Sequence, residues 1–151
     1  WAGVDAVRLL GCYRDRISCF NDDIQGTAAM ALAGLLSALR VTGGKLREQR
    51  LLFLGAGSAA FGIADMVTSA MTLDGLTEAD ARDRIRMYDK RGLIEAGRTD
   101  LLDFQKPFAP AADGARDFAG FIEQGLKEEG YVVDVATDGE EATTLAHVRS
   151  P

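Results

Sequence analysis

The sequence predicts an α/β fold: a truncated, Rossmann-like parallel sheet with helices on both faces. Two observations support this prediction. An apolar run at Leu51–Leu54 has the length of a buried strand and leads directly into the small residues of Gly55–Gly62, which open an apolar helix. A second run, Ile85–Asp89, follows that helix and indicates another strand. Two strands joined through a helix form a parallel crossover unit, which is almost always right-handed.

The composition fits one ordinary globular domain. The chain has 151 residues, of which 47% are hydrophobic and 26% are charged, and its net charge is -6. Because phosphate backbones need a basic surface, this acidic balance argues against nucleic acid as the main partner. No signal-peptide pattern opens the chain and no continuous apolar run reaches the length of a membrane span, so we expect a cytoplasmic location and no membrane partner.

Histidine and cysteine usage limits the metal and redox chemistry that the chain can support. The single histidine, His147, rules out a histidine-rich metal centre, so any metal should be held by carboxylates. The spacing of Cys12 and Cys19 matches no thiol–metal or redox motif. We therefore expect two free thiols, buried or half-buried.

Two helices are expected before the first strand. Apolar residues recur at helical spacing in Val4–Tyr13, which indicates a helix with one apolar face. The segment TAAMALAGLLSALRVT is apolar nearly all round, with Thr27 as its expected cap and Gly43 and Gly44 as its end. A helix without a polar face is expected to be buried.

The small residues after the first strand follow the dinucleotide-binding pattern, with alanine in the last small position. Gly55 permits the tight turn, Gly57 lets the backbone approach a pyrophosphate, and Ala60 lets the helix pack close to the strand. The helix N-terminus then offers free N–H groups to the phosphates. A glycine turn in an unrelated α/β protein remains the alternative. The candidate cofactor-binding residues are Gly55, Ala56, Gly57, Ser58, Ala59, Ala60 and Asp89.

Asp89 ends the second strand, where an acidic side chain can bind the hydroxyls of a ribose. It lies farther from the loop than the usual distance of about 20 residues, and the polar insertion Leu73–Arg84 accounts for the excess. Asp89 favours NAD because it would repel the 2′-phosphate of NADP, although Lys90, Arg91 and Lys106 could offset that repulsion. We therefore expect NAD as the cofactor, with NADP as the alternative.

The segment FNDDIQGTA contains two adjacent aspartates, Asp22 and Asp23, directly before the long apolar helix. Two neighbouring carboxylates repel each other and need a cation or hydrogen-bond donors. One solution is a hard divalent metal, which prefers oxygen ligands. The other is that one aspartate caps the helix. The residues alone favour neither.

A family resemblance bears on this choice. The chain resembles the NAD(P)-binding domain of malic enzymes in three sequence segments, in their order and in their spacing. These segments are FNDDIQGTA, LGAGSAAFGIA and YDKRGLIEAGRTDLLDFQKPFA. The resemblance covers about residues 1–109 and implies a metal-dependent oxidoreductase that decarboxylates malate to pyruvate and CO₂, with NAD or NADP as hydride acceptor. It also implies that Asp23 binds Mg²⁺ or Mn²⁺ and that Asp22 is a catalytic residue. A homo-oligomer is a further expectation.

The resemblance also implies that these residues are incomplete as an enzyme. The family's other metal ligands, an adjacent Glu-Asp pair, would fall just before Trp1, and its catalytic Tyr and Lys farther upstream. We therefore expect little or no activity from this chain alone. A non-catalytic nucleotide-binding module and a signalling or interaction fragment remain alternative functions.

The C-terminal part is expected to differ from the rest. Residues 110–116 form the expected linker, and residues 117–151 contain GYVVDVATDGEEA, which resembles part of a response-regulator receiver domain. The acidic pair and the phosphorylated aspartate of a receiver have no counterpart there, so the resemblance implies no phosphorylation site. The alternative is a further strand–helix unit of the Rossmann-like sheet.

Overall fold

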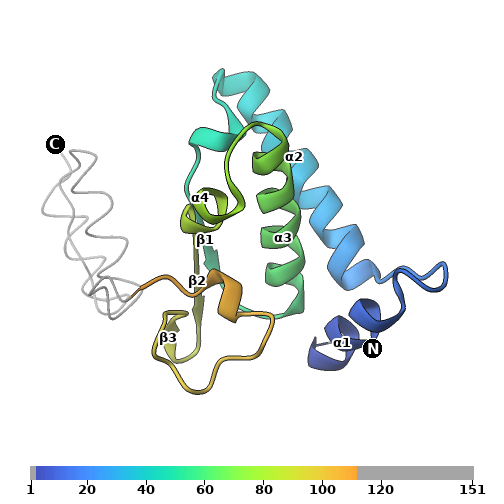
Figure 1. The fold of residues 1–151 in the computed structure, drawn as a ribbon. Coiled ribbons are helices and arrows are strands. Elements are labelled where there is room, and N and C mark those ends of the chain that lie inside the picture. Colours follow the sequence, from blue (N-terminus) through green and yellow to red (C-terminus); the bar gives the residue numbers. More distant parts are fainter. Residues whose placement is uncertain (1–2, 112–151) are drawn as a thin grey trace, which may run out of the picture. The chain divides into compact units, whose positions relative to one another are not determined.

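The computed structural model describes residues 3–111, and the expectations for residues 112–151, the receiver-like segment included, lie outside them. The helices and strands follow in chain order (Figure 1), and their bounds are α1 Gly3–Tyr13, α2 Thr27–Thr42, β1 Leu51–Leu54, α3 Ser58–Leu73, α4 Glu78–Asp83, β2 Ile85–Asp89 and β3 Gly92–Leu93. Three short helical turns complete the described part: η1 Asp22–Gly26, η2 Leu46–Glu48 and η3 Lys106–Phe108.

The sheet has three strands in the order β1-β2-β3. Strands β1 and β2 are parallel, with Leu51 opposite Ile85 and Leu54 opposite Tyr88. The predicted crossover through α3 is therefore confirmed. The short strand β3 pairs antiparallel to β2, with Tyr88 opposite Leu93, so the sheet is not wholly parallel. The chain turns back at Gly92, whose φ of 114° suits glycine.

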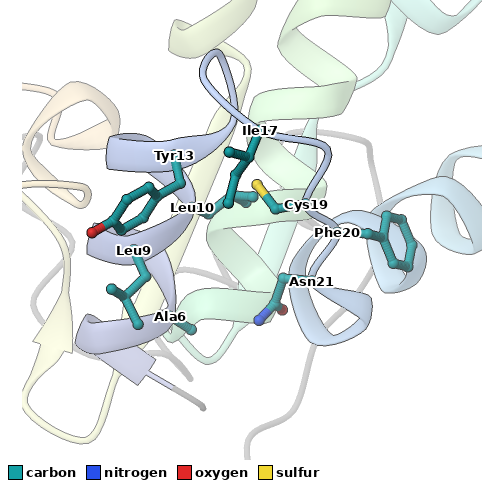
Figure 2. A pocket seen from close by; sticks show the side chains of 8 residues that line it. All are labelled: Ala6, Leu9, Leu10, Tyr13, Ile17, Cys19, Phe20 and Asn21. Atoms are coloured by element: carbon teal, nitrogen blue, oxygen red, sulfur yellow. The ribbon is translucent and has the colours of Figure 1, made fainter.

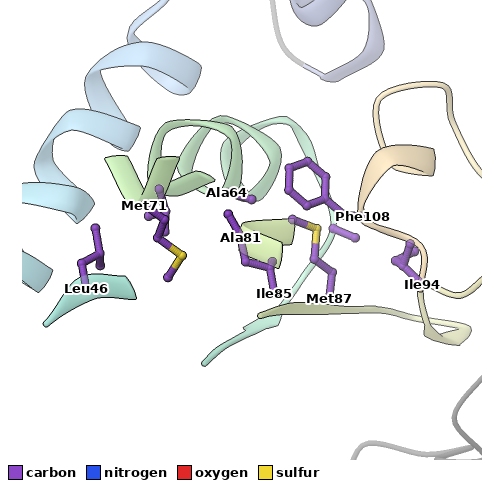
Figure 3. Close-up of a cluster of buried hydrophobic side chains, with 10 residues drawn as sticks. Leu46, Ala64, Met71, Ala81, Ile85, Met87, Ile94 and Phe108 are labelled. Carbon is purple, nitrogen blue, oxygen red and sulfur yellow. The ribbon is translucent and has the colours of Figure 1, made fainter. Parts of the chain in front are cut away.

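The hydrophobic core lies between α3 and the sheet (Figure 3). Ala64, Val67 and Met71 are fully buried and recur at the spacing that places them on one face of α3. From β2, Ile85 and Met87 point into the same cluster. The remaining buried members are Leu46, Ala56, Ala81, Ile94 and Phe108. Because β2 contributes alternate residues to this cluster, its register fixes which side of the sheet receives α3.

Helix α2 differs from the sequence expectation. One face, with Leu32, Leu35 and Leu39, packs partly buried against the core cluster. The opposite face stays open, with Met30 76% and Val41 89% exposed. The expectation that this apolar helix is buried all round is therefore wrong for the described part of the chain, where its principal packing partner is α3.

The continuous helical stretch Asp22–Thr42 is 21 residues long with a mean hydropathy of 1.4. By length and composition alone it could cross a membrane, which the sequence analysis did not anticipate. The same test is passed by apolar helices that pack in a protein core. In the described structure only 11% of its most apolar window is buried, and its principal contacts are with α3.

The backbones of α3 and η1 approach each other closely at Gly62. A Cβ atom at Gly62 would lie 2.7 Å from the carbonyl oxygen of Ile24 and 2.8 Å from its Cγ2. Gly62 and Ile24 are both buried. Only glycine therefore allows α3 and η1 to meet at this distance without displacement.

We expect Gly62→Ala to lower the free energy of unfolding by about 1–3 kcal/mol, because overpacking must push α3 away from η1. Gly34→Ala is the matched control, since Gly34 lies inside α2 and a Cβ there meets nothing within 4 Å. That change should raise the free energy of unfolding by about 0.5–1 kcal/mol. Urea unfolding measures both, and equal effects at the two positions would contradict the close contact.

Candidate functional site

The glycine loop joins β1 to α3 at the carboxyl end of the parallel strands. Gly55 has a φ of 127°, a conformation that favours glycine, and its N–H donates to the Tyr88 carbonyl oxygen at 2.7 Å. This bond fixes the loop against the end of β2. The loop therefore lies beside Asp89, the last residue of β2, as the crossover pattern predicts.

Gly57 precedes the first turn of α3 and has extended backbone angles, with φ -86° and ψ -172°. No side chain caps this helix end. The first helical bond runs from the Phe61 N–H to the Gly57 carbonyl at 2.9 Å, so the N–H groups of Ser58, Ala59 and Ala60 precede it. A Cβ at Gly57 would meet nothing within 4 Å. The helix N-terminus is therefore open to a ligand.

Gln105 holds the glycine loop from a segment distant in sequence. Its Nε2 donates to the Ala56 carbonyl oxygen at 2.7 Å, and its Oε1 accepts from the Leu102 N–H at 2.9 Å. Gln105 is buried, with only 7% exposed. Sequence reasoning missed this residue, because nothing local marks a glutamine as the partner of a loop 49 positions away.

Asp89 lies in a network of ion pairs. The Arg98 guanidinium bonds both of its carboxylate oxygens, Nη1 to Oδ1 at 3.0 Å and Nη2 to Oδ2 at 2.7 Å. Arg98 also bonds Asp100 through Nε at 3.1 Å and Nη2 at 2.7 Å. Arg91 completes the network, because its Nη1 donates to Asp100 Oδ2 at 2.9 Å.

Arg98 sets the electrostatics of this network. Its hydrogen bonds hold the pKa of the Asp89 carboxyl below the ordinary value, against the smaller opposing effect of burial. They lower the pKa of Asp100 far more, and the two carboxylates in turn raise that of Arg98. Sequence reasoning named Lys90, Arg91 and Lys106 as nearby cations and missed Arg98. Lys106 pairs instead with Asp103 at 2.6 Å.

Asp89 keeps one acceptor position for a ligand. Its Oδ1 accepts from the Arg98 Nη1 and from the Arg91 backbone N–H at 2.8 Å, which uses both lone pairs. Its Oδ2 accepts only from Arg98 Nη2 within residues 3–111. One lone pair of Oδ2 therefore remains for a hydroxyl donor such as a ribose.

The aspartate pair is not used as a helix cap. Asn21 caps η1: its Oδ1 accepts from the Ile24 N–H at 3.0 Å, and the Asn21 N–H donates to Gln25 Oε1 at 3.0 Å. This reciprocal arrangement resembles a capping box, with the glutamine one position later in the helix than in the usual motif. The N-cap position of α2 is Gly26, and no side chain caps that helix. The capping interpretation of Asp22 and Asp23 is therefore wrong, and so is Thr27 as a cap, because its hydroxyl donates to the Asp22 carbonyl.

Asp22 and Asp23 are both exposed at the start of η1. The carboxylate of Asp22 folds over Gly26, where a Cβ would collide with Oδ1. Within residues 3–111, no group of three or more histidine, cysteine, aspartate or glutamate side chains is placed to hold a metal. The pair thus offers two carboxylates but no further ligand from the described part of the chain.

Two hollows lie beside α1 rather than at the glycine loop. Figure 2 shows the first, which is lined by residues of α1, among them Leu10 and Tyr13, and by Ile17 and Cys19 of the segment that follows. Cys19 is exposed, as is Cys12, so the expectation of buried or half-buried thiols is wrong. The second hollow, of about 350 Å³, is lined by residues of α1, η1 and α3. Neither includes the predicted cofactor residues.

A β-glycine loop-α-β unit with an acidic residue at the end of the second strand defines a Rossmann-type dinucleotide-binding fold. The protein-family model "Malic enzyme, NAD binding domain" matches residues 24–133. The chain belongs to this family. The match continues past residue 109, where the resemblance was expected to end, and it does not test the division into residues 1–109, 110–116 and 117–151, which stays a prediction.

Curated relatives agree with this assignment. The chain is 46% identical over 124 residues to the NAD-dependent malic enzyme of Acinetobacter baylyi, covering 82% of this chain and 22% of that protein. It is 51% identical over 109 residues to the NAD-dependent malic enzyme of Pseudomonas aeruginosa, covering 72% and 19%. It is also 44% identical over 124 residues to the NADP-dependent malic enzyme of Rattus norvegicus, covering 82% and 22%. The chain thus spans about a fifth of the length of these relatives.

Among solved structures, the crystal structure of Entamoeba histolytica malic enzyme matches with a TM-score of 0.58 and 26% identity, over 73% of this chain and 22% of that one. A second crystal structure, described as a putative malic enzyme (malate oxidoreductase), has a TM-score of 0.59 at 23% identity, over 78% and 31%, and supports the fold alone. The α/β fold class is therefore confirmed.

We expect acid to weaken the described fold through Asp89 and Asp100. Their folded-state pKa values lie below the ordinary value of 3.8, so both ion pairs contribute stability above that pH and lose it as the pH falls further. Asp100→Asn should therefore flatten the decline in unfolding free energy between about pH 5 and pH 2. Asp103→Asn should flatten it less, because that side chain is 97% exposed and water screens its ion pair. Urea unfolding at a series of pH values measures both effects. If the unfolding free energy falls equally steeply with pH in the wild type and in Asp100→Asn, this account is contradicted.

Proposed function

We propose that this chain is the part of a malic enzyme that binds the pyrophosphate and adenosine ribose of NAD. The observation that supports the proposal is the loop Gly55–Ala60, tied by the Gly55 N–H to the end of β2. Its open helix end can receive phosphate oxygens, and Asp89 keeps an acceptor for a ribose hydroxyl. The residues that we propose for cofactor binding are Gly55, Ala56, Gly57, Ser58, Ala59, Ala60 and Asp89.

We further propose that Asp23 supplies one carboxylate ligand to Mg²⁺ or Mn²⁺ and that Asp22 lies beside the reacting groups. The donor chemistry fits a hard divalent cation, because both side chains are exposed carboxylates and neither is used to cap η1. A bound metal would polarise substrate oxygens as a Lewis acid. The implied reaction is oxidative decarboxylation of malate to pyruvate. Homo-oligomer formation and a cytoplasmic location stay predictions.

A nucleotide-binding module without catalysis is the second candidate. It is favoured by the absence of a third potential metal ligand near the aspartate pair within residues 3–111. The two candidates share the glycine loop and differ in whether Asp23 binds metal. They can therefore be tested separately.

Gly57→Val should lower the affinity for NADH by at least about tenfold, or about 1.4 kcal/mol, because its side chain would occupy the approach to the pyrophosphate. The extended backbone and empty surroundings of Gly57 accept valine, so the fold should survive. Gly34→Val, on the exposed part of α2, is the matched control and should leave the affinity unchanged. Calorimetry would decide, and equal NADH affinity in all three proteins would exclude this loop as the cofactor site.

The 151-residue chain should bind Mn²⁺ weakly, with a dissociation constant of about 1 mM or higher, because two carboxylates are a poor site for a hard cation. Asp23→Asn should weaken binding further, whereas Asp15→Asn, an exposed aspartate outside η1, should not. Electron paramagnetic resonance of free Mn²⁺ gives the bound fraction. Equal effects of the two substitutions would show that Asp23 is not a ligand. A dissociation constant below about 1 μM would contradict the proposal that the chain supplies only part of the metal site.

A further inference from the structure

The charged network around Asp89 bears on the choice between NAD and NADP, which the relatives leave open because both kinds are similar to this chain at 44–46% identity. We propose that Asp100 makes the site selective for NAD by occupying the two arginines that a 2′-phosphate would otherwise bind. The inference rests on the proposed role of Asp89 at the adenosine ribose.

Arg98 is the cation in direct contact with Asp89, and its five N–H groups are all used. Nη1 donates to Asp89 Oδ1 and to the Leu93 carbonyl at 3.0 Å, while Nη2 donates to Asp89 Oδ2 and Asp100 Oδ2. Nε donates to Asp100 Oδ1. Since a guanidinium has five N–H groups, none remains for a phosphate. Only 13% of the Arg98 side chain is exposed, which limits its freedom to turn elsewhere.

Asp100 takes two of those five donors and a third from Arg91. Its Oδ2 accepts from Arg98 Nη2 and Arg91 Nη1 at 2.7 and 2.9 Å, so one carboxylate bridges two arginines. Without this carboxylate, two N–H groups of Arg98, on Nε and Nη2, and the Nη1 of Arg91 would lose their acceptor next to Asp89. Two guanidinium forks are well suited to a phosphate.

The charges point the same way. Asp89, Asp100, Arg91 and Arg98 together are neutral, which suits an uncharged 2′-hydroxyl. A 2′-phosphate adds a charge of about -1.5 to -2 beside two carboxylates. Lys106 lies outside this network and pairs with Asp103 at 2.6 Å. Lys90 is exposed and offers a point charge rather than a fork of donors.

The test compares the affinities of the full 151-residue chain for NADH and NADPH by fluorescence titration. Asp100→Asn should narrow the preference for NADH by about tenfold or more, because charge-assisted hydrogen bonds to the freed arginines become available to the 2′-phosphate. The gained NADPH affinity should weaken as salt is added. Asp100→Glu should keep the wild-type preference, because it retains the charge.

Asp103→Asn is the matched control, since it removes one negative charge from the same loop without touching Arg91 or Arg98. The ratio of NADH affinity to NADPH affinity in Asp103→Asn should equal that of the wild type. If the wild type binds NADH through Gly57 but Asp100→Asn leaves the preference unchanged, the inference fails and the proposed function stands. If Asp100→Asn loses NADH as well while Asp100→Glu keeps it, Asp100 only supports the loop and the inference is overturned. If the wild type binds neither dinucleotide, both fail.

Discussion

The described structure depends on the close approach of α3 to η1 at Gly62, where a single methyl group would collide with the backbone of Ile24. Helix α3 carries the open N-terminus at the glycine loop and the buried face that forms the core. η1 carries the two aspartates. The packing of α3 against η1, which Gly62 permits, therefore helps to position the carboxylate pair relative to the proposed cofactor loop. A shift there would move both parts of the site, although neither contains the residues in contact.

The second feature that organises the site is the chain of charges at the carboxyl end of β2. Arg98 links Asp89 to Asp100, and it also binds the Leu93 carbonyl on β3. The antiparallel hairpin β2–β3 thus positions the arginine that holds Asp89 in place. This hairpin is the departure from the expected parallel sheet, so the irregular strand directly supports the proposed ribose contact.

The β1–loop–α3–β2 unit could be predicted because its signals are local: an apolar strand, small residues at fixed spacing and an apolar helix. The same pattern placed Asp89 at the end of the second strand, where the structure has it. Arg98 and Gln105 could not be found, because their roles arise from tertiary contacts with Asp89 and Ala56. The residues alone could not decide whether Asp22 or Asp23 is a cap, because asparagine and aspartate are nearly equal as caps. Only the backbone geometry of η1 distinguishes Asn21 from its neighbours.

The extent to which α2 is buried could not be predicted from the sequence either. Its apolar surface is continuous, and periodicity cannot tell a helix covered on one side from one covered on all sides. In the described residues its partner is α3, and Met30 and Val41 remain open. The family assignment does not change this observation, since the chain spans about a fifth of its relatives.

The central claim, that the Gly55–Ala60 loop and Asp89 bind a dinucleotide, is tested most directly by titrating NAD⁺ into the ¹⁵N-labelled chain and following its backbone amides. The account predicts that the largest shifts fall on Gly57, Ser58 and Ala59, with a second group at Asp89 and Arg98. Shifts confined to α1 and the segment that carries Cys19, with the loop amides unmoved, would contradict it.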